Sequence, residues 1–200
     1  MGTRGLMGFR SNKKDHLTYN HFDSYPSHLG VEMAKFIQKV NQSADTLGAA
    51  KAKVDALAVV DEEKKPTKAQ VEALKKFADT DVSTGKLDEW YVLLRQCQGN
   101  PGATLESGFL ADNHEFVNDS LFCEWAYVAN FDTKILEVYK GFQTEPHTKG
   151  RYAKAKGKKP YKGSENEYYP IALVAEIPFN HVTVEKMEGL EKEVGGEEEE

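Results

Sequence analysis

The chain of 200 residues has little cysteine and no long apolar run, and each shortage excludes a class of protein. Its two cysteines, Cys97 and Cys123, have no CxxC partner and no nearby ligands at metal-site spacing, so we expect reduced, partly buried thiols. No window approaches the roughly 18 to 20 apolar residues of a membrane span, and the start "MGTRGLMGFR" lacks the apolar run of a signal peptide. We therefore expect a cytoplasmic protein with no membrane partner.

An excess of basic charge is also lacking, and the formal net charge of -6 comes from one end of the chain. Residues 185–200, "EKMEGLEKEVGGEEEE", carry eight Glu and two Lys, which leaves 24 acidic and 24 basic residues elsewhere. A segment with this composition is typical of a solvated tail that aids solubility or docks a partner. We expect one domain over residues 1–184, followed by an acidic, disordered tail over 185–200.

Patterns typical of β-strands stand at both ends of the domain. Segments 3–10 and 15–20 flank the polar turn "SNKKD", which predicts a hairpin, and a second hairpin is predicted over 121–132 and 134–142. A last strand is predicted over 168–177. Strands that precede and follow a helical middle favour an α+β protein, in which helices pack on antiparallel or mixed sheets.

Helical patterns fill the middle of the chain. Apolar residues recur at helical spacing from Val31 to Val40, and Thr67 with Gln70 forms a capping-box signature. A further helix is predicted over 86–99, "KLDEWYVLLRQCQG". We interpret about 41–100 as a helical insertion in the single domain.

The segment "TYNHFDSYPSHLG", residues 18–30, gathers polar side chains around Pro26. In a strand, His21 and Asp23 would point to the same side, a spacing that suits an imidazole oriented by a carboxylate or two ligands of one metal ion. A turn at Pro26 would lead into a helix capped by Ser27, whose free N–H groups favour an anion. A purely structural His–Asp pair is the alternative. Two ligands are too few for a metal, so we expect no metal site and no cofactor.

Three stretches carry a resemblance to a known family. "TRGLMGFR", "YNHFDSYPSHLG" and "CEWAYVANFDTKILEVY" resemble an uncharacterised family of phage, bacterial and fungal proteins that begin with a TRGxxGF and YNHFDSYPxxLG pattern. The similarity covers about the first 40 residues and the strands near 121–140. The family has no established activity, so the resemblance implies kinship alone.

A more distant similarity is to the N-terminal-nucleophile hydrolases, which include the class II glutamine amidotransferases. It implies a four-layer αββα sandwich and amidohydrolase- or amidotransferase-like chemistry at a mature N-terminal Cys, Ser or Thr. Removal of Met1 would expose Gly2, so Thr3 is the nucleophile only if a second residue is removed. The hypothesis that we favour keeps the scaffold without that mechanism, which leaves open whether the protein is an enzyme.

We expect a pocket that binds or hydrolyses a small polar or anionic ligand, such as an amide or a nucleotide derivative. His21 is the candidate general base or acid, Asp23 its orienter and Thr3 the alternative nucleophile. Arg4 would clamp a carboxylate or phosphate, and its alternative role is a salt bridge with Asp23 or Glu124. The candidate ligand-binding residues are Arg4, Tyr19, Asn20, Ser24 and Tyr25.

The segment "KGRYAKAKGKKPYK", residues 149–162, has seven Lys or Arg and no acid. It predicts a flexible loop whose charges contact a phosphate backbone and whose Tyr152 and Tyr161 stack on bases, and a plain solvated loop is the alternative. A non-enzymatic, phage-type interaction protein that acts on a host protein or nucleic acid is therefore the competing function. The candidate nucleic-acid contacts are Lys154, Lys156, Lys158, Lys159 and Lys162.

Overall fold

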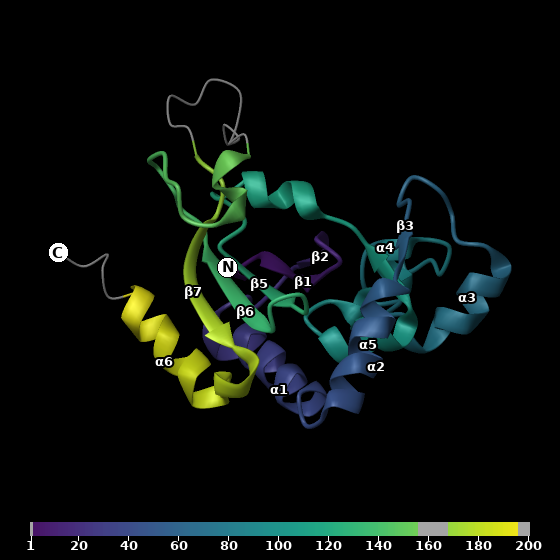
Figure 1. Ribbon diagram of the computed structural model, residues 1–200. Coiled ribbons are helices and arrows are strands. Elements are labelled where there is room, and N and C mark those ends of the chain that lie inside the picture. Colours follow the sequence, from purple (N-terminus) through teal and green to yellow (C-terminus); the bar gives the residue numbers. More distant parts are fainter. Residues whose placement is uncertain (1, 156–167, 196–200) are drawn as a thin grey trace, which may run out of the picture.

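A mixed five-stranded sheet forms the centre of the computed structural model, which describes residues 2–155 and 168–195 (Figure 1). β1 lies between β2 and β5, antiparallel to the first and parallel to the second, and the remaining pairs are antiparallel. The predicted α+β class with a mixed sheet is thus confirmed. In spatial order the strands are β2 (Lys14–Asn20), β1 (Gly5–Ser11), β5 (Trp125–Asn130), β6 (Ile135–Lys140) and β7 (Ala172–Pro178).

The two predicted hairpins are confirmed as β1–β2 and β5–β6. Asn12 and Lys13 join the first pair, with φ angles of 51° and 62°. Two consecutive residues in the left-handed region make the turn whose twist matches that of the flanking strands. The carboxylate of Asp132 accepts both of their backbone N–H groups at 2.8 Å, so the tip of the second hairpin holds the turn of the first.

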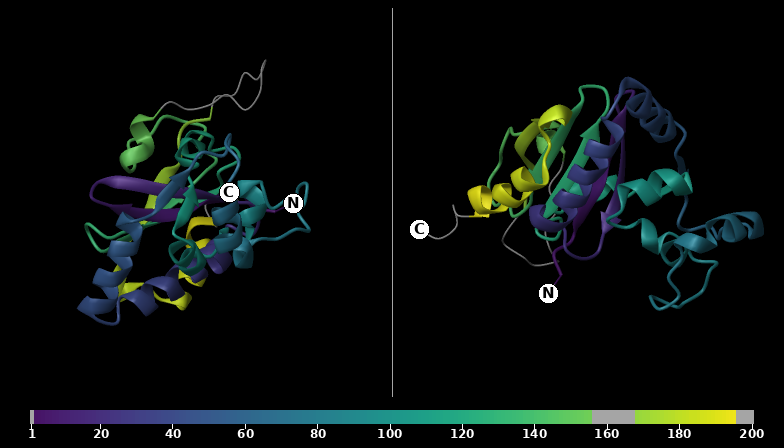
Figure 2. Two further views of the ribbon diagram at one scale, coloured as in Figure 1. Left: turned by 90° about the vertical axis from the view of Figure 1, so that its right-hand side faces the viewer. Right: turned by 90° about the horizontal axis from the view of Figure 1, so that it is seen from below.

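Helices cover the two faces of the sheet, and α1 and α6 lie together on one face (Figures 1 and 2). The apolar stripe predicted from Val31 to Val40 is buried there, where Phe36 packs against Phe9 of β1 with ring centroids 5.6 Å apart. The opposite face buries a smaller cluster around Leu6 and Val128. The elements are α1 (Val31–Val40) and α6 (Val184–Gly195) on the first face, and the short 3-10 helices η4 (His114–Asn118) and η5 (Arg151–Lys154) on the second.

The predicted helical insertion lies beside the sheet, and the short parallel strands β3 (Ala58–Val60) and β4 (Phe109–Ala111) extend it beyond residue 100 (Figure 1). The capping box is confirmed, because Thr67 and Gln70 each accept the other's backbone N–H. Its helices are α2 (Ala44–Asp55), α3 (Lys68–Leu74), α4 (Trp90–Leu93) and α5 (Pro101–Ser107), with 3-10 turns η2 (Lys75–Phe77) and η3 (Arg95–Cys97).

The single helix predicted over 86–99 is wrong. Hydroxyl groups of Ser83 and Thr84 donate to the carboxylate of Glu89, which holds the preceding residues in a turn. Helical geometry therefore begins only at Trp90 and continues for one turn before the 3-10 turn η3.

The predicted disordered tail is wrong for residues up to 195, which form α6. Met187 and Leu190 are buried against the sheet, and Lys140 donates to the carbonyl oxygen of Val194 at 3.1 Å. The prediction of a disordered tail was wrong because it used the high Glu content and did not consider the apolar residues three and four positions apart, which form one face of a helix. Residues 196–200 lie outside the described part of the chain.

The finer architecture of a four-layer sandwich needs a second large sheet stacked on the first. Within residues 2–155 and 168–195 the only sheets are the five-stranded one and the β3–β4 pair, so these layers are not seen. No helix in the same residues has the length and apolar character that a membrane crossing requires.

The packing of α6 gives a direct test of its place in the core. Met187 is fully buried, so Met187→Ala should lower the free energy of unfolding by about 2–5 kcal/mol. Glu188→Ala, at an exposed neighbouring position, should change it by less than about 0.5 kcal/mol. Chemical denaturation of the two variants measures both values, and equal small effects would show that α6 does not pack on the sheet.

Candidate functional site

The inward side chains of the segment 18–30 hold a turn. Asn20 and Ser24 are both buried, and the Asn20 side-chain N–H donates to Ser24 Oγ at 2.9 Å. The Ser24 backbone N–H donates to the Thr3 carbonyl at 3.1 Å, and the Tyr127 hydroxyl donates to the Ser24 carbonyl at 2.9 Å. Two residues predicted to bind a ligand thus join β2, the chain start and β5.

Thr3, the alternative nucleophile, lies under this turn. It is 1% exposed, and its Oγ1 has no hydrogen-bond partner in the described part of the chain. A nucleophilic hydroxyl has to reach both a base and a substrate. The arrangement therefore gives Thr3 no access to either.

His21 is on the outward side, and its partner differs from the predicted one. Its Nδ1 is 2.9 Å from the hydroxyl of Tyr19, a predicted ligand-binding residue. Asp23 is exposed with a φ of 53°, and no hydrogen bond joins it to His21. The predicted orienting role of Asp23 is therefore not seen; β2 ends at Asn20, so strand alternation does not extend to Asp23.

Arg4 lies beside the same hydroxyl at the start of β1. Its guanidinium is 4.7 Å from the centroid of the Phe122 ring and interacts with the side chain of Tyr19. The expected salt bridge with Asp23 or Glu124 is not formed; Glu124 accepts only the Arg4 backbone N–H, at 3.4 Å. Burial raises the pKa of Glu124, and Arg4 acts in the opposite direction.

Arg95 is a site residue that the sequence analysis missed. It lies in η3, where its Nη1 donates to Gln98 Oε1 at 3.1 Å and its Nε is buried without a partner among the described residues. An arginine in "LLRQCQG" has no local signal of function, because its neighbours in space come from the other end of the domain.

The four arginines of the chain fall into two pairs. Arg10 and Arg151 both form salt bridges with Asp15, at 2.9 and 3.0 Å. Arg4 and Arg95 form no salt bridge with any carboxylate in residues 2–155 and 168–195. The second pair therefore leaves positive charge available at one end of the sheet.

The two arginines that form no salt bridge among the described residues both affect the pKa of His21. Burial lowers the pKa of the His21 imidazole, and the charges of Arg95 and then Arg4 lower it further. Burial is also the main cause that raises the pKa of Tyr19. The imidazole is thus neutral at pH 7 and able to accept a proton, while the hydroxyl beside it stays protonated.

An open hollow of about 470 Å³ is lined by Arg95, whereas Arg4, Tyr19 and His21 are not among the residues that line it. Its volume is in the range of small-molecule sites. Arg95 joins it from the helical part, and Asn20, Phe22 and Asp23 line it from the turn. His28 lines it from the π-helical turn that follows. Glu32 and Lys35, which form an ion pair at 2.7 Å, line it from α1.

The anion site predicted at Ser27 is already occupied by the chain itself. The Ser27 backbone N–H donates to Glu191 Oε2 of α6 at 3.2 Å. Ser27 also fails as the expected cap, because Pro26–Gly30 forms a π-helical turn that runs into α1 and the Ser27 hydroxyl pairs with His28 Nδ1. Tyr25, another predicted ligand contact, is partly exposed with its ring 6.4 Å from that of His28.

The described part of the basic segment is anchored to the sheet. Arg151 pairs with Asp15 and with the buried Glu137, and the Tyr152 hydroxyl donates to Asp15 at 3.1 Å. The base-stacking role predicted for Tyr152 is therefore not supported. Lys154 is exposed at the end of η5, and the other candidates, Lys156, Lys158, Lys159 and Lys162, lie outside the described residues together with Tyr161.

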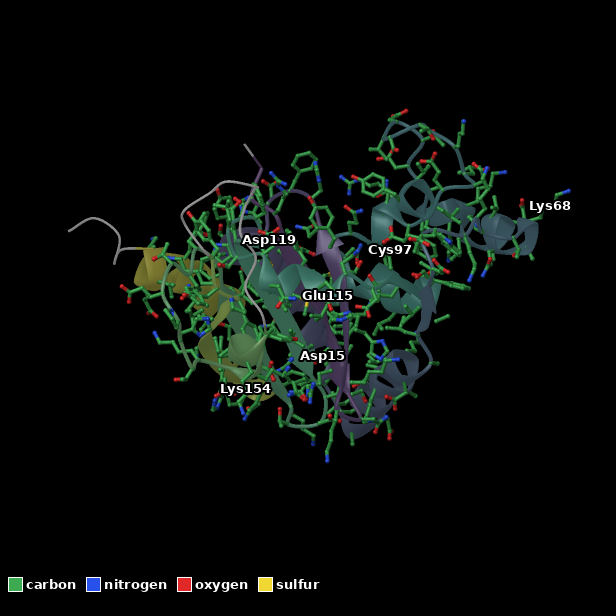
Figure 3. The ribbon with its side chains drawn as sticks, turned by 90° about the horizontal axis from the view of Figure 1, so that it is seen from above. Asp15, Lys68, Cys97, Glu115, Asp119 and Lys154 are labelled. Atoms are coloured by element: carbon green, nitrogen blue, oxygen red, sulfur yellow. The ribbon has the colours of Figure 1, made fainter. Side chains whose placement is uncertain are left out.

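The cysteines and the remaining acidic clusters add no second reactive site. Cys97 is buried inside the helical part (Figure 3), where burial raises its pKa to about 11, and burial also raises the pKa of Cys123. His114 lies between the carboxylates of Asp112 and Glu115, at 3.1 Å from each. The described residues contain no group of three or more His, Cys, Asp or Glu placed to hold a metal ion.

No protein-family model, curated protein or solved structure matches the chain. The resemblances in sequence therefore rest on the N-terminal motifs and the strands near 121–140 alone.

The charge around His21 predicts its titration. NMR should give His21 a pKa below the ordinary 6.5, and Arg95→Gln should raise it because one repelling charge is lost. Since the unfolded chain keeps the ordinary pKa, it binds this proton first as the pH falls, so His21 should reduce folding stability below about pH 6.5. Lys68→Gln, at the outer end of the helical part (Figure 3), is the control and should leave the pKa unchanged. An unchanged pKa in Arg95→Gln would contradict the arrangement.

Proposed function

We propose that the protein binds a small anionic ligand between Arg4 and Arg95 and uses His21 as the acid–base group to hydrolyse it, with amides and nucleotide derivatives as the substrate classes. The observation that carries this proposal is the pair of guanidinium groups that have no carboxylate partner in the described residues and that both act on one imidazole.

The state of Arg95 supports ligand binding. A buried N–H without a partner costs free energy, and buried polar groups in folded proteins are nearly always paired. The Nε of Arg95 lacks such a partner while the same residue lines an open hollow. A carboxylate or phosphate oxygen in the hollow would accept from the guanidinium of Arg95, because this planar group is suited to two parallel hydrogen bonds with such an anion.

The environment of His21 supports acid–base chemistry. A neutral imidazole takes a proton from water, the resulting hydroxide attacks a carbonyl carbon or phosphorus, and the proton passes to the leaving group. Tyr19 replaces Asp23 as the group that holds the ring, through its hydroxyl at 2.9 Å from Nδ1. N-terminal-nucleophile chemistry at Thr3 is the less favoured route, because that hydroxyl is buried.

Arginine substitutions test the binding step. Arg4→Gln and Arg95→Gln should each weaken the binding of inorganic phosphate, measured by isothermal titration calorimetry, by about 10- to 100-fold, because a hydrogen bond to a charged group contributes about 1.5–3 kcal/mol. Lys68→Gln removes the same charge from an exposed position and should leave binding unchanged. Equal binding by all three variants, or no binding by the unaltered protein, would contradict the proposal.

A non-enzymatic interaction protein is the second candidate, and one surface favours it. A groove of about 440 Å³ between α1, α2 and α5 has an apolar floor that includes Phe36 and Leu105, and Lys39 and Lys53 stand at its rim. Such a groove suits an acidic, partly apolar segment of another protein. Loss of hydrolysis without loss of partner binding in a His21→Ala variant would separate the two functions.

A further inference from the structure

The hollow contains an aromatic ring that the proposed anion site does not use. Phe22 is 52% exposed, the largest exposed fraction among the large apolar side chains of the described residues. It lines the same hollow as Arg95. The hollow therefore offers an exposed aromatic ring and a guanidinium, and the carboxylates of Asp23 and Glu32 also belong to its lining.

Several contacts involve the ring and the backbone of Phe22. The ring of His21 meets it nearly edge-on, with centroids 4.2 Å apart and planes at 84°. Gly2 lies so close that a Cβ there would overlap the Phe22 ring, and the side chain of Asn20 donates to the Phe22 carbonyl. Asp23, with its positive φ of 53°, fixes the backbone that follows. The backbone of Phe22 is therefore held by the turn, and its ring contacts His21 and Gly2.

The ring belongs to a row of aromatic side chains that meet edge to face. Phe116 and Tyr19 have centroids 5.5 Å apart, and Tyr19 and His21 have centroids 5.7 Å apart. Phe22 ends this row at the hollow. Phe22 keeps 52% of its surface exposed at this end of the row, and an exposed face of an aromatic ring is the surface on which a flat heterocycle stacks.

We infer that the anionic ligand is a nucleotide whose base stacks on Phe22 and whose phosphate binds Arg95, the two side chains that line one hollow. This inference rests on the proposed anion site and narrows its ligand from anions in general to those that carry a flat aromatic group. An amide or a sugar phosphate would use the arginines and leave the ring of Phe22 in water. A nucleotide contacts both the guanidinium and the Phe22 ring. The hollow of about 470 Å³ has room for a nucleotide.

Calorimetric titration with adenosine 5′-monophosphate and ribose 5-phosphate separates the base from the phosphate. The nucleotide should bind about 5- to 100-fold more tightly than the sugar phosphate, the range that stacking of one base on an aromatic side chain provides. Phe22→Leu should remove this preference and leave the binding of ribose 5-phosphate unchanged, and Phe22→Trp should restore it. Phe142→Leu is the matched control, because Phe142 is also exposed, at 43%, and does not line the hollow.

The outcomes distinguish the inference from the proposed function. If the nucleotide and ribose 5-phosphate bind equally well, or if Phe22→Leu keeps the preference for the nucleotide, stacking of the base on Phe22 is contradicted. The proposed anion site is not contradicted by either result. Binding of neither compound overturns both. If the preference for the nucleotide depends on Phe22 but Arg95→Gln does not weaken binding, the stacking surface is supported and the phosphate site at Arg95 is contradicted.

Two sources of the nucleotide are possible, a free compound and the end of a single strand. A short single-stranded oligonucleotide with a 5′-phosphate, titrated alongside the monophosphate, identifies the source. Binding more than about tenfold tighter than the monophosphate assigns a polynucleotide end, and equal or weaker binding assigns the free nucleotide.

Discussion

The position of β1 inside the sheet is the constraint on which the site depends. Because this strand pairs with β2 on one side and with β5 on the other, the first residues of the chain meet side chains more than a hundred positions away. The close pairing requires glycine: a Cβ at Gly5 would overlap the carbonyl oxygen of Trp125, and one at Gly8 would overlap that of His16. Arg4 therefore lies where β2 ends and β5 begins.

The arginine side chains of the protein fall into two groups, one that stabilises the fold and one that lies at the candidate site. Arg151, Asp15 and Glu137 pair on the sheet face under η5, where Glu137 also accepts from Asn130 at 2.7 Å. Removing one member of such a group leaves a buried charge unpaired, so these residues serve the fold. The guanidinium of Arg95 has no such partner in the described residues, and this contrast is the physical basis for assigning it to a ligand.

Local signals in the sequence predicted the parts that local chemistry determines. The hairpin over 3–20, the apolar stripe from Val31 to Val40 and the capping box at Thr67 were all confirmed. The errors arose where a tertiary contact overrides the local pattern: α6 is ordered by burial of Met187, and the amide predicted to bind an anion at Ser27 meets a carboxylate of α6.

The candidate site could be predicted only in part for the same reason. His21, Tyr19 and Arg4 do gather at one place, but Asn20 and Ser24 turn inward, because a sequence motif does not show which of its side chains point toward the core. No pattern in the sequence marks Arg95 as a residue of the candidate site, because its position relative to His21 depends on how the helical part packs beside the sheet.

A crystal structure of the protein with bound tungstate tests the anion site most directly, because this heavy phosphate analogue gives unmistakable density. We expect the anion in the hollow, with an oxygen within hydrogen-bond distance of the Arg95 guanidinium. An empty hollow, or tungstate bound only at surface lysines, would contradict the site.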